Sequence, residues 1–130
     1  MDSKTILVAV VDDELIYRKL LIRKLTQNGM VVILEAEHGC DFLLQLHSKR
    51  FLPQIVIMDI EMPVMDGFQT ISRLKSQWKG IKVVAHSSLC DEETINRVQS
   101  CGADLFVAKP DRSNGLTEAI LSLLGDGLVL

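Results

Sequence analysis

Short apolar runs alternate with segments of helical period along this sequence, and this alternation limits the fold more than any other feature. Five runs rich in β-branched residues predict strands, over residues 5–11, 31–36, 54–59, 82–87 and 105–109. The runs are continuously apolar instead of alternating with polar residues. This pattern is typical of parallel strands that are covered on both faces of a sheet.

The intervening segments place apolar residues three or four positions apart, which predicts amphipathic helices. The predicted helices cover residues 14–27, 40–49, 67–78, 91–101 and 113–124. We expect Gly102 to cap the end of the fourth helix and Ser113 to be the N-cap of the fifth. The buried stripe of the first helix is expected to consist of Ile16, Leu20, Leu21 and Leu25.

Five strands that alternate with five helices form an α/β fold, in which right-handed crossovers connect parallel strands. We expect a flavodoxin-like (βα)5 sandwich, with strands in the order 2-1-3-4-5 and helices on both faces of the sheet. Ligands of such a fold bind beyond the carboxyl ends of the strands, at the switch point between strands one and three. The length of 130 residues fits a single domain.

Charge and composition exclude several classes of function. The net charge is −3 and no basic face is indicated, so we expect no direct binding of nucleic acid. Four cations of the first predicted helix are expected to form a solvated face: Arg18, Lys19, Arg23 and Lys24.

The sequence also indicates a location. The apolar run over residues 6–11 is too short for a signal peptide or a membrane span, so we expect no contact with a membrane. The three cysteines, Cys40, Cys90 and Cys101, form no CxxC pair. A reduced, cytoplasmic protein fits this pattern best.

Polar residues stand at the carboxyl ends of four of the five predicted strands. Asp12 and Asp13 follow the first strand, Asp59 ends the third, Ser87 ends the fourth and Lys109 ends the fifth. Because the carboxyl ends of parallel strands meet at one edge of a sheet, we expect these side chains to face one crevice. The second strand ends in residues 35–37, at the sheet edge and away from the crevice.

Carboxylates that lie within a few ångströms of one another repel, and they would not all stay ionised without a counter-charge. A hard divalent cation supplies that charge, and oxygen ligands in an open site favour Mg²⁺, with Mn²⁺ as an alternative. A carboxylate at such a site can attack phosphorus and form an aspartyl phosphate. Lys109 would then supply positive charge to the phosphoryl oxygens, and Ser87 a hydroxyl donor.

Each of these residues also has a purely structural interpretation. Asp12 and Asp13 could cap the following helix and interact with its dipole instead of binding a metal. Asp66 is expected to be the N-cap of the third helix. Ser87 or Lys109 alone indicates nothing, so the functional interpretation depends on finding all of these residues at the right strand ends.

Four motifs resemble those of the receiver domain of bacterial two-component response regulators, including the single-domain chemotaxis regulators. They are VVDDE (10–14), IVIMDIEMPVMDG (55–67), VVAHSS (83–88) and FVAKP (106–110). The resemblance extends from residue 4 to about residue 124. We therefore expect residues 1–130 to hold one receiver domain, with residues 125–130 as a tail or the beginning of a linker.

The resemblance implies a role for each acidic residue of the crevice. Asp59 would accept a phosphoryl group from a phosphohistidine of a partner protein. Asp13, Asp59 and the backbone carbonyl of Glu61 would bind Mg²⁺. Asp12 would act through water in the outer shell of the metal.

The resemblance also implies a switch. Ser87 and Lys109 would contact the phosphoryl oxygens, and Phe106 stands at the aromatic switch position of the family. Phosphorylation adds about −1.5 to −2 charge and three acceptor oxygens, which would draw Ser87 towards the site. The space left by Ser87 would let Phe106 turn inwards and repack the face formed by helix 4, strand 5 and helix 5.

Four positions depart from the usual pattern of the family. Asp111 and His86 stand where apolar residues are usual, and Phe106 lacks the hydroxyl group of a tyrosine. Glu61 places a negative charge beside the phosphoryl group, at a position that often tunes the lifetime of the phosphoryl-aspartate. For His86 we expect a half-covered side chain that is hydrogen-bonded to backbone, and not a catalytic role.

The expected function is that of a signalling domain, which catalyses only its own phosphorylation and dephosphorylation. Its expected partners are a sensor histidine kinase or a His-phosphotransfer protein, and a downstream partner or output domain on the helix 4–strand 5–helix 5 face, which could also form a homodimer. Two alternatives are a Mg²⁺-dependent phosphohydrolase on a similar sheet and a receiver that acts as a phosphorylation-independent interaction module.

Overall fold

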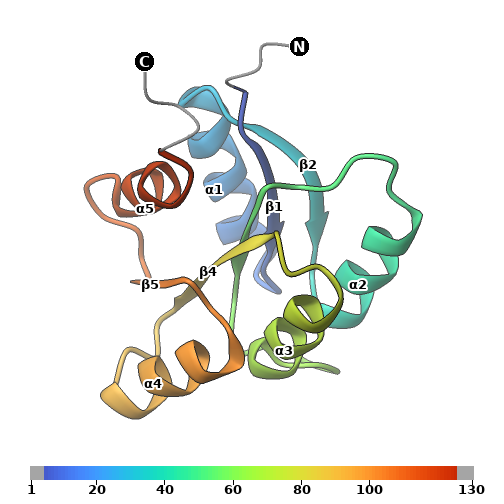
Figure 1. The fold of residues 1–130 in the computed structure, drawn as a ribbon. Coiled ribbons are helices and arrows are strands. Elements are labelled where there is room, and N and C mark those ends of the chain that lie inside the picture. The colour runs from blue at the N-terminus through green and yellow to red at the C-terminus, as the bar shows by residue number, and fades with distance from the viewer. Residues whose placement is uncertain (1–4, 126–130) are drawn as a thin grey trace.

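A computed structural model describes residues 5–125 and shows a parallel sheet of five strands flanked by helices (Figure 1). The strand order is β2-β1-β3-β4-β5, which confirms the predicted topology. The expected tail, residues 125–130, lies outside the described residues except for Gly125. The elements are β1 (Leu7–Val11), α1 (Leu15–Gln27), β2 (Val31–Ala36), α2 (Gly39–Ser48), β3 (Ile55–Met58), α3 (Gly67–Gln77), β4 (Lys82–Ser87), α4 (Glu92–Cys101), β5 (Leu105–Ala108) and α5 (Gly115–Leu124).

Backbone hydrogen bonds of the sheet continue past the ends of β3 and β5. The amide of Asp59 donates to the carbonyl of Val11 at 2.9 Å, and the amide of Lys109 donates to the carbonyl of Ser87 at 2.9 Å. Asp59 and Lys109 therefore lie just beyond their strands, yet their backbones are held by the neighbouring strand. This fixes the direction in which both side chains leave the sheet.

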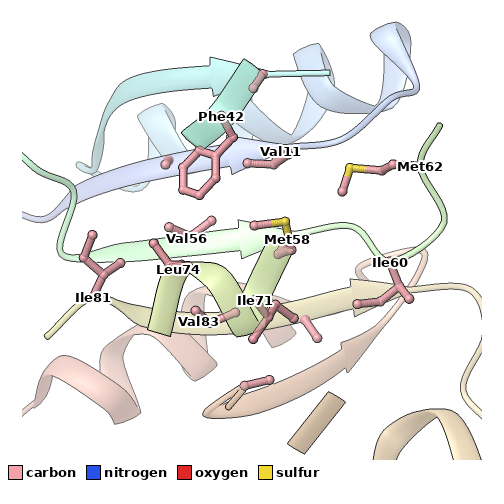
Figure 2. Close-up of a cluster of buried hydrophobic side chains, with 14 of the residues drawn as sticks. Val11, Phe42, Val56, Met58, Ile60, Met62, Ile71, Leu74, Ile81 and Val83 are labelled. Atoms are coloured by element: carbon pink, nitrogen blue, oxygen red, sulfur yellow. The ribbon is translucent and has the colours of Figure 1, made fainter. Parts of the chain in front are cut away.

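The sheet separates two cores. On one face, α2, α3 and α4 cover the strands with side chains such as Phe42, Ile71 and Leu74 (Figures 1 and 2). On the other face, α1 and α5 cover them with Leu25 and Ile120, among others. Because every residue of β3 is buried, this strand is covered on both faces, as its continuous apolar run predicted.

The helices and strands differ in how deeply they are buried. The residues of the edge strand β5 are half-buried or exposed, and the other edge strand, β2, has two buried residues of six, so the expectation of full coverage is wrong for both edge strands. Helix α3 has four buried residues, Gly67, Thr70, Ile71 and Leu74. Helix α4 has one, Val98.

The buried face of α1 differs from the predicted stripe. Ile16 and Leu20 are 76% and 58% exposed, whereas Leu21 and Leu25 are buried. Arg18 completes the buried face and is 9% exposed, so the expected solvated face of cations is wrong at this position. The helix is apolar on two sides, and the side that faces the sheet combines Leu21 and Leu25 with Arg18, whose guanidinium has polar partners there.

The predicted caps are confirmed for α3 and α4 and wrong for α5. The Asp66 carboxylate accepts a hydrogen bond from the amide of Gln69 at 2.9 Å, and Gly102 is left-handed with φ 115°. Ser113 is not the N-cap of α5, because the helix begins after Asn114 and both residues have positive φ.

The Asp111 carboxylate accepts a hydrogen bond at the amino end of α5 instead. Its Oδ1 accepts a hydrogen bond from the amide of Leu116 at 3.1 Å, and its Oδ2 forms an ion pair with Lys24 Nζ at 2.6 Å. The departure from the family pattern at Asp111 thus joins α5 to α1.

None of the helices within residues 5–125 is long and apolar enough to cross a membrane.

Candidate functional site

Three of the predicted site residues meet at the carboxyl end of the sheet. The side-chain ammonium of Lys109 lies 2.7 Å from Asp12 Oδ2 and 3.4 Å from Asp59 Oδ1. Asp12 is 2% exposed and Asp59 is 5% exposed, so both carboxylates are buried beside a single cation. The lysine from β5 therefore bridges the acids from β1 and β3, as the positions at the strand ends predicted.

Three carboxylates lie together where this crevice meets solvent. One oxygen from each of Asp12, Asp13 and Glu14 lies within 4.8 Å of the other two. Asp13 and Glu14 are exposed, while Asp12 is buried. Hard oxygen donors at such spacing, with room for water on one side, fit a divalent cation such as Mg²⁺. Glu14 was not among the predicted ligands, although it directly follows the acidic pair.

The electrostatics of the crevice act mainly on Asp59. The pKa of Asp59 is raised to about 7, mainly by burial; Lys109 opposes this shift, while the charge of Asp12 and a hydrogen bond with Asp13 contribute to it. Burial alone would lower the pKa of Lys109, but its contacts with Asp12 and Asp59 outweigh burial and raise it. Lys109 is therefore a firmly charged group, whereas Asp59 holds a proton readily until a cation replaces it.

Ser87 and Phe106 lie beside the crevice on neighbouring strands. Ser87 is 1% exposed, and its hydroxyl oxygen accepts a hydrogen bond from the amide of Leu89 at 3.0 Å. Phe106 pairs with Ala85 in the register of β4 and β5, and it packs half-buried against the core under α2, α3 and α4. Glu61 is exposed.

The loop after Asp59 is held against α3 by a close backbone contact. The amide of Gly67 donates to the carbonyl of Ile60 at 2.8 Å. A Cβ atom at Gly67 would lie 2.4 Å from the backbone oxygen of Asp59, so only glycine allows this approach. Within the loop, Val64 is 79% exposed and has a φ of 69°, a conformation that a β-branched residue rarely adopts.

Arg18 belongs to the surroundings of the site and was not predicted there. Its Nη1 donates to the backbone oxygen of Asp12 at 2.7 Å, and its Nε donates to Glu35 Oε2 at 3.0 Å. Glu35 was expected to lie away from the crevice, but it is connected to it through Arg18. The spacing of Arg18, Leu21 and Leu25 is a helical stripe and was the one signal in the sequence for this role.

His86 makes the predicted hydrogen bond to backbone but is more deeply buried than expected. Its Nδ1 lies 2.7 Å from the carbonyl oxygen of Val107, and its Nε2 lies 2.6 Å from the hydroxyl oxygen of Tyr17. The side chain is 1% exposed, and burial lowers the pKa of the imidazole. Tyr17, like Arg18, was not among the predicted residues.

A five-stranded parallel sheet with an acidic crevice opposite a lysine defines a class of phosphorylated signalling domains, the receivers. The family described as response regulator receiver domain matches residues 8–121, and the chain belongs to this family. It is a CheY-like phosphoacceptor domain of a two-component system. Family membership does not favour the two alternatives, a phosphohydrolase and a phosphorylation-independent interaction module.

Similar proteins include single-domain and multidomain members. The chain is 31% identical over 117 residues to the chemotaxis protein CheY of Halobacterium salinarum, covering 90% of this chain and 95% of that protein. It is 36% identical over 105 residues to protein-glutamate methylesterase/protein-glutamine glutaminase 3 of Hahella chejuensis, covering 79% of this chain and 30% of that protein. A chain in the crystal structure of the CheX–CheY–BeF3–Mg complex from Borrelia burgdorferi superposes with a TM-score of 0.86 at 27% identity, covering 92% of this chain and 89% of that one.

Proposed function

We propose that Asp59 is the phosphoacceptor of this receiver domain and that Lys109 contacts the phosphoryl group. The observation that supports this assignment is the bridge that Lys109 forms between Asp12 and Asp59 in a buried crevice. A carboxylate becomes nucleophilic towards phosphorus when positive charge shields the incoming phosphoryl oxygens. Lys109 is positioned to supply part of that charge.

The remaining charge would come from Mg²⁺ or Mn²⁺, with Asp13, Asp59 and the backbone carbonyl of Glu61 as ligands. Asp12 would contact the metal through water. The cluster of hard oxygens at Asp12, Asp13 and Glu14 supports a cation at this end of the sheet. A bound divalent cation would neutralise carboxylate and phosphoryl charge together.

The proposed switch connects the phosphoryl group to the face formed by α4, β5 and α5. Ser87 would exchange its present hydrogen bond with the Leu89 amide for one to a phosphoryl oxygen. This movement would free space for Phe106, which lies half-buried on the neighbouring strand. A downstream partner or output domain, or a second copy in a homodimer, would bind the rearranged face.

The donor of the phosphoryl group would be a histidine kinase or a His-phosphotransfer protein that docks on α1. Three apolar side chains of this helix are 57%, 76% and 58% exposed: Leu15, Ile16 and Leu20. Leu15 and Ile16 directly follow Asp13 and Glu14, and Leu20 lies one turn further along α1. A partner helix packed there would place its phosphohistidine near Asp59. The three free cysteines support the inference of a reduced, cytoplasmic location.

Labelling by a small phosphodonor tests the assignment of Asp59. Acetyl phosphate with Mg²⁺ should add one phosphoryl mass to the wild type, as read by intact mass spectrometry. Asp59→Asn should abolish the gain, and removal of Mg²⁺ by a chelator should do the same. Asp91→Asn is the matched control, because Asp91 is an exposed N-cap of α4 and should leave labelling intact. Equal labelling of Asp59→Asn and wild type would disprove the assignment.

A second experiment separates docking from chemistry. Ile16→Glu combined with Leu20→Glu should leave labelling by acetyl phosphate unchanged, because both side chains point to solvent. The same variant should lose at least about tenfold in the rate of phosphotransfer from autophosphorylated histidine kinases that label the wild type. An unchanged phosphotransfer rate would exclude α1 as the docking face.

A further inference from the structure

Tyr17 is the one tyrosine of the chain and lies half-buried on α1, between the acidic crevice and α5. The ammonium nitrogen of Lys109 lies 4.8 Å from the centroid of the Tyr17 ring. This separation allows a cation–π interaction, which strengthens when water is excluded. The Lys109 side chain is 9% exposed, so the contact is largely desolvated.

The hydroxyl group of Tyr17 is held from two other elements. The hydrogen-bond directions follow from the Val107 carbonyl, which can only accept, so His86 Nδ1 carries the hydrogen at 2.7 Å. In a neutral imidazole Nε2 is then the acceptor, and the Tyr17 hydroxyl donates to it at 2.6 Å. The Tyr17 oxygen accepts in turn from the amide of Asp111 at 3.2 Å.

These bonds fix the position of the Tyr17 hydroxyl oxygen and thus the direction of the ring axis. His86 belongs to β4, and Asp111 lies between β5 and α5, so three segments distant in sequence meet at one hydroxyl group. Asp111 is itself held by Lys24, with 2.6 Å between Nζ and Oδ2. The side chain therefore cannot swing away from Lys109 by a change of χ1 without breaking the hydrogen bond to a buried histidine.

We propose that Tyr17 is a positioning residue for Lys109, and the proposal rests on the role assigned above to Lys109. Asp12 holds the ammonium at 2.7 Å, and the Tyr17 ring provides a second contact with its centroid at 4.8 Å. A cation or phosphoryl group in the crevice would interact with the same carboxylates that now hold Lys109. The ring does not compete for those groups, so it keeps the flexible lysine pointed at Asp59 throughout the reaction.

The affinity for beryllofluoride, a phosphoryl mimic, measured in Mg²⁺ by amide NMR titration, tests this role. Tyr17→Leu should weaken beryllofluoride binding about 5- to 30-fold, the range expected for a desolvated cation–π contact. Tyr17→Phe keeps the ring and should lose only about 2- to 4-fold. The affinity for Mg²⁺ alone should change less than twofold in both variants, whereas general disruption of the crevice would weaken both ligands equally and overturn the proposal.

A double-mutant cycle shows whether Tyr17 acts through Lys109. In the Lys109→Ala background, Tyr17→Leu should have no further effect on beryllofluoride affinity. An equal loss in both backgrounds would overturn the proposal. Lys75→Met is the control for general destabilisation, because it breaks the Lys75–Asp104 ion pair of 2.9 Å outside the crevice and should leave beryllofluoride affinity unchanged.

An NMR measurement without metal tests the same role of Tyr17. The side-chain protons of Lys109 next to the ammonium should show an upfield ring-current shift in the wild type and in Tyr17→Phe. They should move to ordinary positions in Tyr17→Leu, and the absence of a shift in the wild type would overturn the proposal even if Tyr17→Leu fails to fold. If the wild type shows the shift but binds no beryllofluoride, the function proposed for Asp59 and Lys109 fails instead.

Discussion

Lys109 lies closer to Asp12 than to Asp59, with its ammonium nitrogen 2.7 Å from the first carboxylate and 3.4 Å from the second. The Lys109 ammonium is therefore mainly engaged by Asp12. Asp59 is left with less compensation, in agreement with its pKa of about 7. This imbalance makes Asp59, the proposed phosphoacceptor, the group whose charge depends most on a bound cation.

Asp59→Asn should stabilise the metal-free protein in a pH-dependent manner. Between about pH 4 and pH 7 the native Asp59 holds a proton that the unfolded chain has released, so stability falls as the pH rises. Asparagine removes this cost. Chemical unfolding should show a difference near zero at pH 4 that grows to about 2–4 kcal/mol at pH 8. A difference independent of pH would contradict the raised pKa, and saturating Mg²⁺ should shrink the difference.

His86 should produce a dependence of opposite sign. Its pKa is lowered by burial, so below the ordinary histidine pKa of 6.5 the unfolded chain binds a proton that the native state does not. Stability should therefore be lost as the pH falls from about 7 to 5. Asp59 acts in the same window, so the comparison belongs in the Asp59→Asn background. There, His86→Gln should flatten the pH profile, and an unchanged slope would show that His86 is not the titrating group.

Gly67→Ala should destabilise the fold by about 1–3 kcal/mol and slow labelling by acetyl phosphate. The added Cβ would lie 2.4 Å from the backbone oxygen of Asp59 and 2.7 Å from Ile60 Cα, so the loop must move. Gly80→Ala is the matched control, because its Cβ would meet nothing within 4 Å. Denaturant unfolding of the two variants side by side checks the prediction, and similar losses in both would refute it.

Val64→Gly should stabilise the protein by about 0.5–1 kcal/mol. Val64 has a left-handed backbone conformation, and its replacement by glycine should relieve about 1–2 kcal/mol of backbone strain. The greater freedom of glycine in the unfolded chain offsets part of this gain. Val31→Gly provides the contrast, because Val31 is 40% exposed in β2 and its φ is not among the positive values. That variant should be destabilised, and thermal unfolding of both proteins compares the signs directly.

The residues at the strand ends were predictable because the sequence pattern that marks the end of each strand is local. A continuously apolar run that stops at Asp59 or Lys109 fixes both the strand and the residue at its end, and the topology brings those ends together. The proposed metal ligands and the switch role of Phe106 stay predictions, because they depend on groups that bind from outside the chain. Local patterns also gave the caps at Asp66 and Gly102, where a single residue decides the end of a helix.

The surroundings of the site were not predictable, because they depend on distant partners. Helix α1 is apolar on two sides, and the side that faces the sheet includes Arg18, whose partner Glu35 lies in β2. Tyr17 and His86 are 69 positions apart, and no periodicity in the sequence relates them. At α5, a serine next to the helix predicted a cap, but the more distant Asp111 serves the helix end.

The single buried residue of α4, Val98, has a mechanical consequence. Lifting this helix from the sheet would remove one fully buried side chain from the core, whereas lifting α3 would remove four buried residues, including Ile71 and Leu74. The connection from Ser87 to α4 therefore leads from the proposed phosphorylation site to the helix with the fewest buried residues. A helix held by so few buried residues can shift while most of both cores stays packed.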